Sequence, residues 1–457
     1  MVGTAGRLHR KLSAFGVLLL TLSCNSPVYS IYGFGTDILQ QAGTGTAGLF
    51  VLGVGAAAVW AIIYAELSSA YPYAGGEYVG VGSILGPWAG VASLTILAVT
   101  LGPILAFLAK TLAPYALDLL PAANANLVTF GALAVAVALA MLGVRTNAVV
   151  TGILLAIEML AVLALTVVGL WHPARSLNSV IAHPVALLTT GGLAPVAFGT
   201  MALAAVSAAY ATVGGQQAIP FGEELTDPHR HMGRVVLLAG LIGAVGTAVP
   251  LIAVVTGATD LAVILKSPAP CSAFFAAVAG PAAGRALSAS VAIAVFNALI
   301  ALTMFSARVF FSLGRDELFN ARINRMLATV HGASGAPRLA TLVVGTIAAA
   351  CCVLDFHWLV VFLSGSVVFT LTLASCAVLV GRKKGLTGQT GYWRSPLFPL
   401  IPIMGLCLAA AFAAADLLDA DVGRPSLLLL GSIILMALLW HKLVLKRREG
   451  GWTPRLG

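Results

Sequence analysis

The feature that most constrains this chain is a series of apolar blocks, each roughly 18–25 residues long, that recurs along the whole sequence. A helix of that length covers about 30 Å of hydrocarbon. Only 9% of the residues are charged and 60% are hydrophobic, whereas about a quarter of the residues in a typical soluble domain are charged. The blocks therefore predict an all-α, polytopic membrane protein.

We expect about twelve transmembrane helices. Their predicted ranges are 14–36, 46–70, 86–117, 126–144, 148–171, 193–222, 233–257, 286–313, 338–354, 358–381, 397–416 and 425–445. The longer connections are 172–192, 258–285 and 314–337, and none of them is long enough for a soluble domain. Residues 1–457 are therefore predicted to form a single transmembrane domain.

The net charge of +9 is distributed in a way that predicts orientation. If the N-terminus is cytoplasmic, all but five of the 25 lysines and arginines fall on the cytoplasmic side; the five are Lys110, Arg175, Lys266, Arg285 and Arg424. This is the positive-inside bias of membrane proteins. We expect a plasma (inner) membrane protein with both termini in the cytoplasm, and no nucleic acid partner.

The N-terminal segment resembles a signal peptide, because Arg7 and Lys11 precede an apolar stretch and Cys24 follows it. Thr21 stands where an aliphatic residue is usual, and further spans follow, so we interpret the segment as the first span. Of the six cysteines, only Cys271 lies in a predicted outer loop. We therefore predict no disulfide, no metal site and no cofactor.

Two predicted spans contain sequences that break helices. The first span has Pro27 in its middle, within the polar stretch from Thr21 to Ser30, and the sixth has the pair Gly214–Gly215 followed by two amides. Proline removes a backbone donor, and glycine leaves helical geometry at low cost. Unwound backbone at membrane depth is tolerated only where protein buries it or where it lines a cavity. Either break alone could be a packed kink, but two breaks five spans apart match a pair of five-helix repeats.

Several motifs resemble those of the amino acid–polyamine–organocation (APC) family of permeases, in the same order. They are Ala65–Tyr78 with Gly86–Pro87, Gly214–Gln217 with Glu223–Arg230, Ser306–Arg308, Gly314–Phe319 and Gly335–Pro337. The resemblance implies the fold of the leucine-transporter class. It places inverted repeats at about 14–171 and 193–381, with extra helices at about 397–445, and a substrate site between the two broken helices.

Such a site suits a zwitterion, because a half-helix N-terminus binds a carboxylate and unwound carbonyls bind an ammonium. The resemblance carries substrate binding to Ser26, Pro27, Val28, Tyr29, Ser30, Tyr210, Ala211, Thr212, Val213, Gly214 and Gly215. Tyr210 matches a position where some relatives stack an aromatic ring on the substrate, although helix packing is the alternative. Val28, Tyr29 and Ser30 replace the family's Gly-Ser-Gly stretch, which would narrow the pocket or move the break toward Asn25–Pro27.

Glu158 is an acid with apolar residues for about two turns on either side. Burial favours its neutral form, so it could load and release a proton. It matches a position where some proton-coupled relatives carry a lysine, and we predict that it couples transport to protons. The alternative is a structural carboxyl that is hydrogen-bonded to the first or eighth span.

Four amides are expected to support the site rather than to contact the substrate: Asn25, Gln216, Gln217 and Asn297. For Gln216 we predict hydrogen bonds that order the unwound segment, and for Asn297 interhelical packing is the favoured interpretation. Charged residues at the cytoplasmic ends of the spans could form an ion-pair gate or could be solvated loop charges; they are Glu66, Glu223, Glu224, Arg308, Arg315 and Asp316.

The function predicted from these features is secondary active transport of small amino acids, by symport or antiport, with protons as the coupling ion. The alternatives are a polyamine or cationic amino acid exchanger of the same fold, and a non-transporting sensor. We do not expect an enzyme, because the eight histidines lie in loops or at span ends and no nucleophile–base pair or phosphate-binding loop is apparent.

Overall fold

The computed structural model describes residues 8, 10, 12–119, 122–171, 173–188, 192–331, 335–447 and 451–456. Its first half consists of α1 (Ala14–Asn25), α2 (Pro27–Ser30), the π-helix η1 (Ile31–Gly35), α3 (Thr36–Ala42), the 3₁₀ turn η2 (Gly43–Gly45), α4 (Thr46–Ala70), α5 (Glu77–Leu85), α6 (Pro87–Leu119), α7 (Ala125–Ala140), α8 (Val144–Trp171) and α9 (Leu177–Ala182). These helices confirm the predicted all-α class for this half.

The second half begins with a short antiparallel hairpin, β1 (Val185–Leu187) and β2 (Leu193–Pro195), in which Ala186 pairs with Ala194. The following helices are α10 (Phe198–Thr212), the 3₁₀ segment η3 (Gly215–Glu224), α11 (Pro228–Gly257), α12 (Leu261–Lys266), α13 (Pro270–Ala279), α14 (Pro281–Arg315), α15 (Ala321–Leu327), α16 (Arg338–Cys351), α17 (Phe356–Ser364), α18 (Ser366–Lys383), α19 (Leu400–Leu418), α20 (Gly423–Leu443) and η4 (Leu445–Arg447).

Within the described residues, nine helical segments are long and apolar enough to cross a membrane. The first of them, Ala14–Ala70, has 57 residues and contains both of the first two predicted spans. The fourth and ninth predicted spans correspond to the shorter apolar helices Ala125–Ala140 and Arg338–Cys351. The other predicted spans agree with the observed helices to within several residues, as the predicted range 46–70 does with α4. The sixth, 193–222, is wrong at its start, where Leu193–Pro195 form β2 and the helix begins at Phe198.

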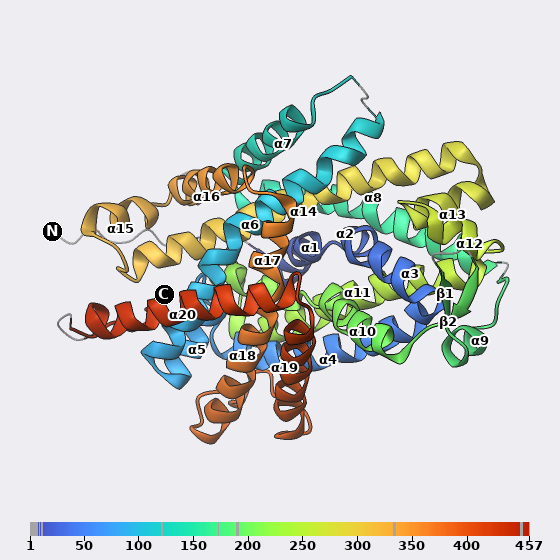
Figure 1. Ribbon diagram of the computed structural model, residues 1–457. Helices are drawn as coiled ribbons and strands as arrows, with labels where there is room; N and C mark the ends of the chain where they lie inside the picture. Colours follow the sequence, from blue (N-terminus) through green and yellow to red (C-terminus); the bar gives the residue numbers. More distant parts are fainter. Residues whose placement is uncertain are drawn as a thin grey trace.

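The chain folds back at η2, where Gly43 has φ +52, a backbone conformation that glycine adopts without steric cost. A side chain is also excluded there, because a Cβ on Gly43 would lie 2.0 Å from the carbonyl oxygen of Val185. In Figure 1, α3 runs toward the end of the molecule that holds β1, β2 and α12, and α4 runs back toward the opposite end, where both termini lie.

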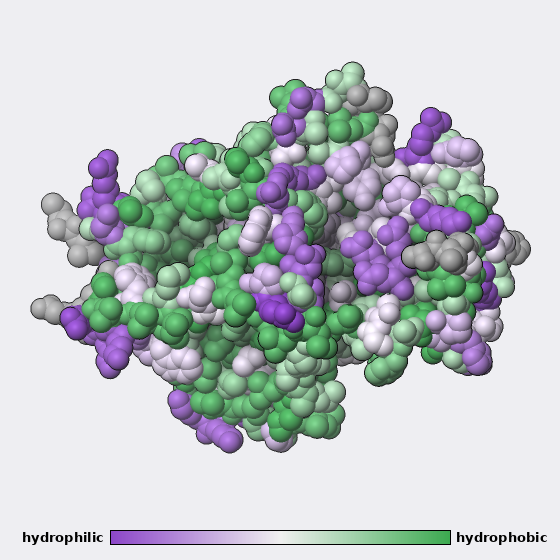
Figure 2. Space-filling view, in the orientation of Figure 1, coloured by the Kyte–Doolittle hydropathy of each residue, from purple (hydrophilic) through white to green (hydrophobic). Residues whose placement is uncertain are grey.

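The helices near the breaks form the buried centre, and the later helices lie outside them. Helix α11 packs along α4 and α8, and α14 packs against α6 and α8. Helix α20 exposes large apolar side chains such as Leu428, Leu435 and Leu439. Broad areas of the face in Figure 2 are hydrophobic, and hydrophilic side chains lie at both ends of the molecule and in a group near the middle of this face. This distribution fits a molecule surrounded by lipid.

Candidate functional site

The first helix is interrupted at Ser26, as the sequence predicted. Ser26 has φ 25 and ψ 96, outside helical geometry, so α1 ends at Asn25 and α2 starts at Pro27. Proline suits this first helical position because its missing N–H would be unpaired there in any case. The Ser26 hydroxyl then accepts a hydrogen bond from the backbone N–H of Tyr29 (3.2 Å), which is a standard N-cap. The break therefore lies within Asn25–Pro27. This is the range toward which the bulkier residues Val28, Tyr29 and Ser30 were expected to move it.

The second break separates α10 from η3 and also confirms its prediction. Helix α10 ends at Thr212, Val213 is extended with φ −87 and ψ 148, and Gly214 has φ 169. The chain resumes as a 3₁₀ helix at Gly215. A Cβ on Gly215 would lie 2.3 Å from the carbonyl oxygen of Val236 on α11, so this position must remain glycine for the segment to pack.

The two breaks meet at Asn25. A Cβ on Gly214 would lie 2.1 Å from the Asn25 Oδ1 atom, and a Cβ on Gly243 of α11 would lie 2.2 Å from its Nδ2 atom. The amide thus fits between two bare glycine backbones, and only 8% of the Asn25 residue is exposed. Residues far apart in the sequence therefore form one junction of unwound backbone.

Glu158 on α8 reaches the same junction. Its Oε1 atom accepts hydrogen bonds from the Ser26 hydroxyl (2.7 Å) and from the backbone N–H of Val28 (3.1 Å). These donors belong to the first turn after the break, where helix N–H groups lack partners within the helix. The carboxyl therefore stabilises the start of α2.

The second oxygen of Glu158 is buried without a hydrogen bond. Asn297 on α14 lies beside this carboxyl, and both polar atoms of its amide are also buried without a hydrogen bond among the described residues. Buried polar groups without partners are uncommon in folded proteins. Asn297, one of the four amides expected to support the site, for which interhelical packing was the favoured interpretation, thus lies next to Glu158 at the junction.

Aromatic rings cover the junction on the side toward α3. Tyr29 packs edge-on against Phe34 (6.3 Å between ring centroids) and against Phe107 of α6 (6.0 Å). Tyr210 of α10 packs edge-on against Phe34 at 5.1 Å. Tyr210 therefore belongs to an aromatic group that joins the two broken helices. It packs against another helix, as the alternative interpretation of this residue expected.

The remaining predicted site residues lie around the junction with different orientations. Ala211 is buried, and the Thr212 hydroxyl donates to the Gly53 carbonyl of α4 (2.9 Å) and to its own helix. The backbone N–H of Ser30 donates to the Ser26 carbonyl (3.1 Å). Thus Thr212 is directed at α4 and away from the other break.

The two glutamines after the second break also differ. The Gln216 Oε1 atom accepts a hydrogen bond from the Trp60 indole of α4 (2.9 Å), which ties the start of η3 to α4. The Gln217 Oε1 atom is buried without a partner. Its backbone N–H donates to the Gly214 carbonyl (3.1 Å), which closes the first turn of η3.

Two ion pairs join η3 to α14 at the end of the molecule that carries the termini. Arg308 binds Glu224 through Nε (2.5 Å) and Nη2 (3.1 Å), with both side chains at most 3% exposed, and Arg315 binds Glu223 (2.8 Å). Arg308 also lies over the Phe221 ring, 4.6 Å from its centroid. The interpretation of these residues as solvated loop charges is wrong, since they are paired and largely buried.

Glu66 forms a third buried pair. Its carboxylate forms an ion pair with Arg382 of α18 (2.5 Å). It also accepts hydrogen bonds from the Thr387 hydroxyl (2.8 Å) and from the backbone N–H of Ser395 (2.8 Å). The sequence identified Glu66 but not its partners. The available signal was that a charge near the end of an apolar helix needs a pairing group once buried, although nothing in the sequence selects Arg382 from the other basic residues.

Asp316 links three segments that sequence reasoning did not connect. It accepts a hydrogen bond from the Tyr78 hydroxyl of α5 (2.7 Å) and one from the backbone N–H of Arg455 (3.2 Å), and its carbonyl accepts from the Trp452 indole (3.1 Å). Burial raises the pKa of Asp316 to about 6, although the Tyr78 hydrogen bond opposes this shift. Residues after η4 are therefore docked onto the end of α14.

Glu77 is a second buried acid outside the membrane-spanning segments. It begins α5, next to the Tyr64 hydroxyl, and burial raises its pKa to about 7. Within the described part of the chain, no group of three or more histidine, cysteine or acidic side chains could hold a metal ion. The described cysteines are all free thiols.

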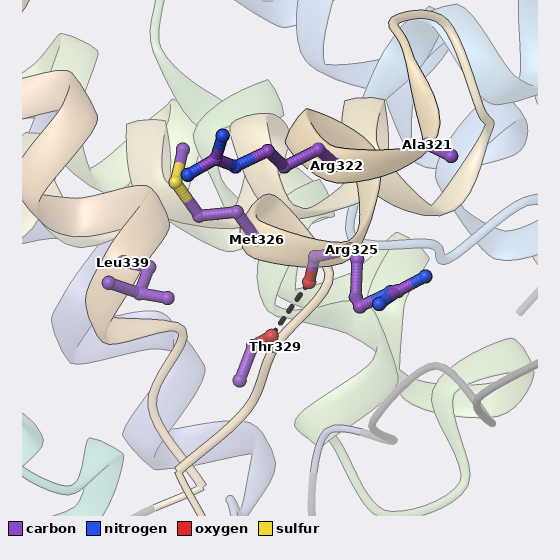
Figure 3. A pocket seen from close by; sticks show the side chains of 6 residues that line it. All are labelled: Ala321, Arg322, Arg325, Met326, Thr329 and Leu339. Carbon is purple, nitrogen blue, oxygen red and sulfur yellow. Dashed lines mark hydrogen bonds between the residues drawn. The ribbon is translucent and has the colours of Figure 1, made fainter.

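Two open hollows on the surface lie away from the junction. One, of about 480 Å³, is lined by Ala321, Arg322, Arg325, Met326, Thr329 and Leu339 between α15 and α16 (Figure 3). The other, of about 440 Å³, is lined by Arg10, Asp227, Pro228, His229, Arg230, Gly391 and Tyr392. Neither contains a predicted site residue, so the junction remains the candidate substrate site.

Comparison with known proteins agrees with this arrangement. A family model described as amino acid permease matches residues 12–439, whereas no curated protein matches the chain. The matched range includes both helix breaks, Glu158 and the three buried ion pairs. The chain therefore belongs to the amino acid permease family of the APC superfamily, and it is a multi-pass membrane protein of a family that transports amino acids and does not consist of enzymes.

Proposed function

We propose that this protein moves small neutral amino acids across the plasma (inner) membrane by alternating access, driven by protons. The observation that carries the proposal is the meeting of the two helix breaks at Asn25 and Gly214. We further propose twelve crossings with both termini cytoplasmic. The first two crossings would lie within Ala14–Ala70, and α7 and α16 would cross as shorter helices. Two inverted five-helix repeats would then each begin with a broken helix.

The substrate would bind where the unwound backbone leaves peptide groups unpaired. The N–H groups of Val28, Tyr29 and Ser30 are already paired with Glu158 and Ser26, so the N–H groups after Gly214 would receive the carboxylate. Carbonyls before each break suit the ammonium. The aromatic rings of Tyr29 and Tyr210 would cover the bound molecule from the side of α3. A small side chain fits best, because Val28 and Tyr29 take space that glycines would leave open.

Glu158 supplies a route for proton coupling. Its ionised carboxylate makes charge-assisted hydrogen bonds to Ser26 and Val28, and such bonds are roughly twice as strong as neutral ones. A proton added at Oε2 would weaken them, and the new O–H could donate to Asn297 Oδ1, which has no other partner. Protonation of Glu158 would therefore weaken the attachment of the start of α2 to α8. Movement of the broken helix formed by α1 and α2 would in this way depend on the proton.

The buried ion pairs and the aromatic group would serve as the two gates. Arg308–Glu224 and Arg315–Glu223 fix η3 to α14 on the proposed cytoplasmic side. Tyr29, Phe34 and Tyr210 join the broken helices on the opposite side. Alternating access requires that one set separates while the other stays closed.

The substrate site is tested by a Gly214→Ala variant. The purified protein is first screened by thermal shift against amino acids and amines, and the hits are tested for flux in liposomes. The new methyl group overlaps Asn25, so we expect at least a tenfold loss of affinity for the hits. Gly55→Ala in α4 is the matched control, because its Cβ meets nothing within 4 Å. Unchanged affinity in Gly214→Ala would place the substrate elsewhere.

Proton coupling is tested by Glu158→Gln, whose amide oxygen can still accept from Ser26 and Val28. We expect substrate binding and exchange to persist, while accumulation driven by an imposed pH gradient disappears. Glu317→Gln, at an exposed carboxyl, serves as the control. If Glu158→Gln still accumulates substrate in response to the pH gradient, Glu158 is not the proton carrier.

One observation favours the second candidate, a transporter of cationic amino acids or polyamines. Asp416 of α19 lies within electrostatic range of Tyr210 and beside Ser364. A carboxylate next to the aromatic group could attract the extra positive charge of such a substrate. Asp416→Asn separates the candidates: it should weaken uptake of cationic hits several-fold but leave neutral hits unchanged.

A further inference from the structure

The outward face of α15 combines arginines with apolar side chains. Its inward positions, Asn324 and Leu327, are buried, whereas Arg322, Ile323, Arg325 and Met326 are all exposed. A helix surrounded by water would carry mostly polar residues on that face. Long basic side chains among apolar ones are typical of a helix at a membrane surface, where the charged ends reach the headgroups and the apolar parts enter the lipid.

The hollow between α15 and α16 opens on that surface. Met326, Leu339, Arg322, Arg325 and Thr329 are among the residues that line it, with the Arg322 side chain lying beside Met326 and the Arg325 side chain pointing away from it (Figure 3). The Thr329 hydroxyl donates to the Arg325 carbonyl (2.7 Å), which holds Thr329 to the end of α15. The volume of about 480 Å³ is large enough for a phosphate and its glycerol.

The charges around the hollow favour an anion. Among the described residues, the ion pairs of this region use Arg315 and Arg455 with Glu223 and Glu317, and none of them includes Arg322 or Arg325. Guanidinium groups bind phosphate oxygens in a bidentate manner. Two arginines without carboxylate partners therefore present charge that a phosphodiester would complement.

The neighbouring helix continues this surface as an apolar stripe. Leu339 and Leu342 of α16 are 39% and 47% exposed, and their spacing of three residues places them on one side of the helix. Because the stripe starts at the hollow itself, acyl chains of a lipid could lie along it while the headgroup occupies the hollow. A soluble phosphate would leave this stripe unused.

We propose that the hollow between α15 and α16 binds an anionic phospholipid, in the leaflet on the side of the two termini. The phosphate contacts Arg322 beside Met326, and Arg325, which points away in Figure 3, turns toward it on binding; the glycerol lies against Met326 and Leu339, and one acyl chain follows α16. This binding would also hold α15 next to the end of α14, which carries Arg308 and Arg315. Binding is independent of the substrate, so it can be tested whether or not amino acid transport is observed.

The test measures lipid retention by the full-length protein. The chain is purified from vesicles of phosphatidylcholine with or without phosphatidylglycerol, and native mass spectrometry counts the retained lipids. An arginine near a charged membrane contributes about fivefold in affinity, so Arg322→Gln with Arg325→Gln should reduce phosphatidylglycerol retention by at least fivefold. Excess inorganic phosphate should not displace the lipid, and displacement would show a free-phosphate site instead.

The matched control is Lys383→Gln with Arg394→Gln, which removes two exposed charges elsewhere in the chain. A second variant, Thr329→Glu, keeps both arginines but gives them a carboxylate, and it should also reduce retention. Equal loss in the control variant would show that total charge, and not the hollow, retains the lipid. Unchanged retention in both the double variant and Thr329→Glu would overturn the proposal.

Discussion

Two buried glutamates in this protein have opposite surroundings. Glu224, at the end of η3, is 1% exposed and receives two guanidinium hydrogen bonds from Arg308. Glu158, at the helix-1 break, is 0% exposed and receives only a hydroxyl and a backbone N–H on one of its oxygens. Both lie in the same fold at the same degree of burial, but only one has a cation beside it.

The difference shows how burial can serve two purposes. A carboxylate paired with arginine resists protonation, because the cation would be left unpaired, so the pair can act as a fixed connection between helices. A carboxyl held by neutral donors can take up or release its proton without leaving a cation unpaired, and its ionised form is held by those hydrogen bonds alone. The first arrangement suits a gate, and the second suits a proton carrier.

The largest expected effect comes from breaking the paired arrangement. Arg308→Met leaves the Glu224 carboxylate buried without its cation, and we expect a loss of about 3–5 kcal/mol of stability. It should be measured as a fall in Tm of the protein in detergent. The double variant Arg308→Met with Glu224→Gln should recover much of the loss, because no buried charge remains.

The exposed pair between Arg455 and Glu317 is the control for this prediction. Its side chains are 52% and 53% exposed, and surface ion pairs contribute about 0–1 kcal/mol. Arg455→Gln should therefore shift Tm only slightly. If Arg308→Met and Arg455→Gln have equal effects, the buried pair does not hold η3 to α14 in the way proposed.

The next effect uses Glu77, a buried acid that resembles Glu158 in lacking a cation but lies outside the membrane-spanning segments. Burial raises its pKa from 4.5 to about 7, so the folded protein binds a proton that the unfolded chain releases. Stability from this group is therefore complete below about pH 4.5 and is lost as pH rises through 7. Glu77→Gln should remove the dependence and raise stability near pH 8 by at most about 3 kcal/mol.

Thermal unfolding near pH 5 and near pH 8 measures this effect, with Asp421→Asn as a control at an exposed carboxyl. Glu77→Gln should unfold at a higher temperature than the unmodified protein near pH 8 and at a similar temperature near pH 5. A variant that loses stability at both pH values would mean that the Glu77 carboxylate is stabilised by contacts that an amide cannot make.

Much of the fold could be predicted from the sequence, because hydrocarbon allows few structures other than helices. The range 46–70 matches α4, and Pro27 and the Gly214–Gly215 pair identified both breaks. The spans at α7 and α16 were also predicted, although these helices are shorter than a typical crossing. Local composition was sufficient for these features because each depends on residues that are adjacent in the chain.

The contacts between distant residues could not be predicted in the same way. Asn25 was placed near the site, but its fit between Gly214 and Gly243 depends on how three helices approach one another. The partner of Glu66 is 316 residues away in the sequence, and the docking of Trp452 on Asp316 joins the last described residues to α14. Pairing of this kind is set by tertiary geometry, which a single sequence does not reveal.

The smallest expected effect examines how many donors a paired carboxylate needs. Glu66 has Arg382, the Ser395 N–H and the Thr387 hydroxyl, so removing the hydroxyl leaves the cation in place. Thr387→Val keeps the shape of the side chain and should cost about 1.5–3 kcal/mol, which is the usual contribution of one hydrogen bond to a charged group. Thr346→Val is the control, because that exposed hydroxyl bonds only to the Leu342 carbonyl of its own helix.

A loss in Thr387→Val as large as that in Arg308→Met would mean that neutral donors stabilise these carboxylates as much as arginine does. The contrast between Glu224 and Glu158 would then lose its physical basis, because the presence of a cation would no longer distinguish a fixed carboxylate from one that exchanges a proton.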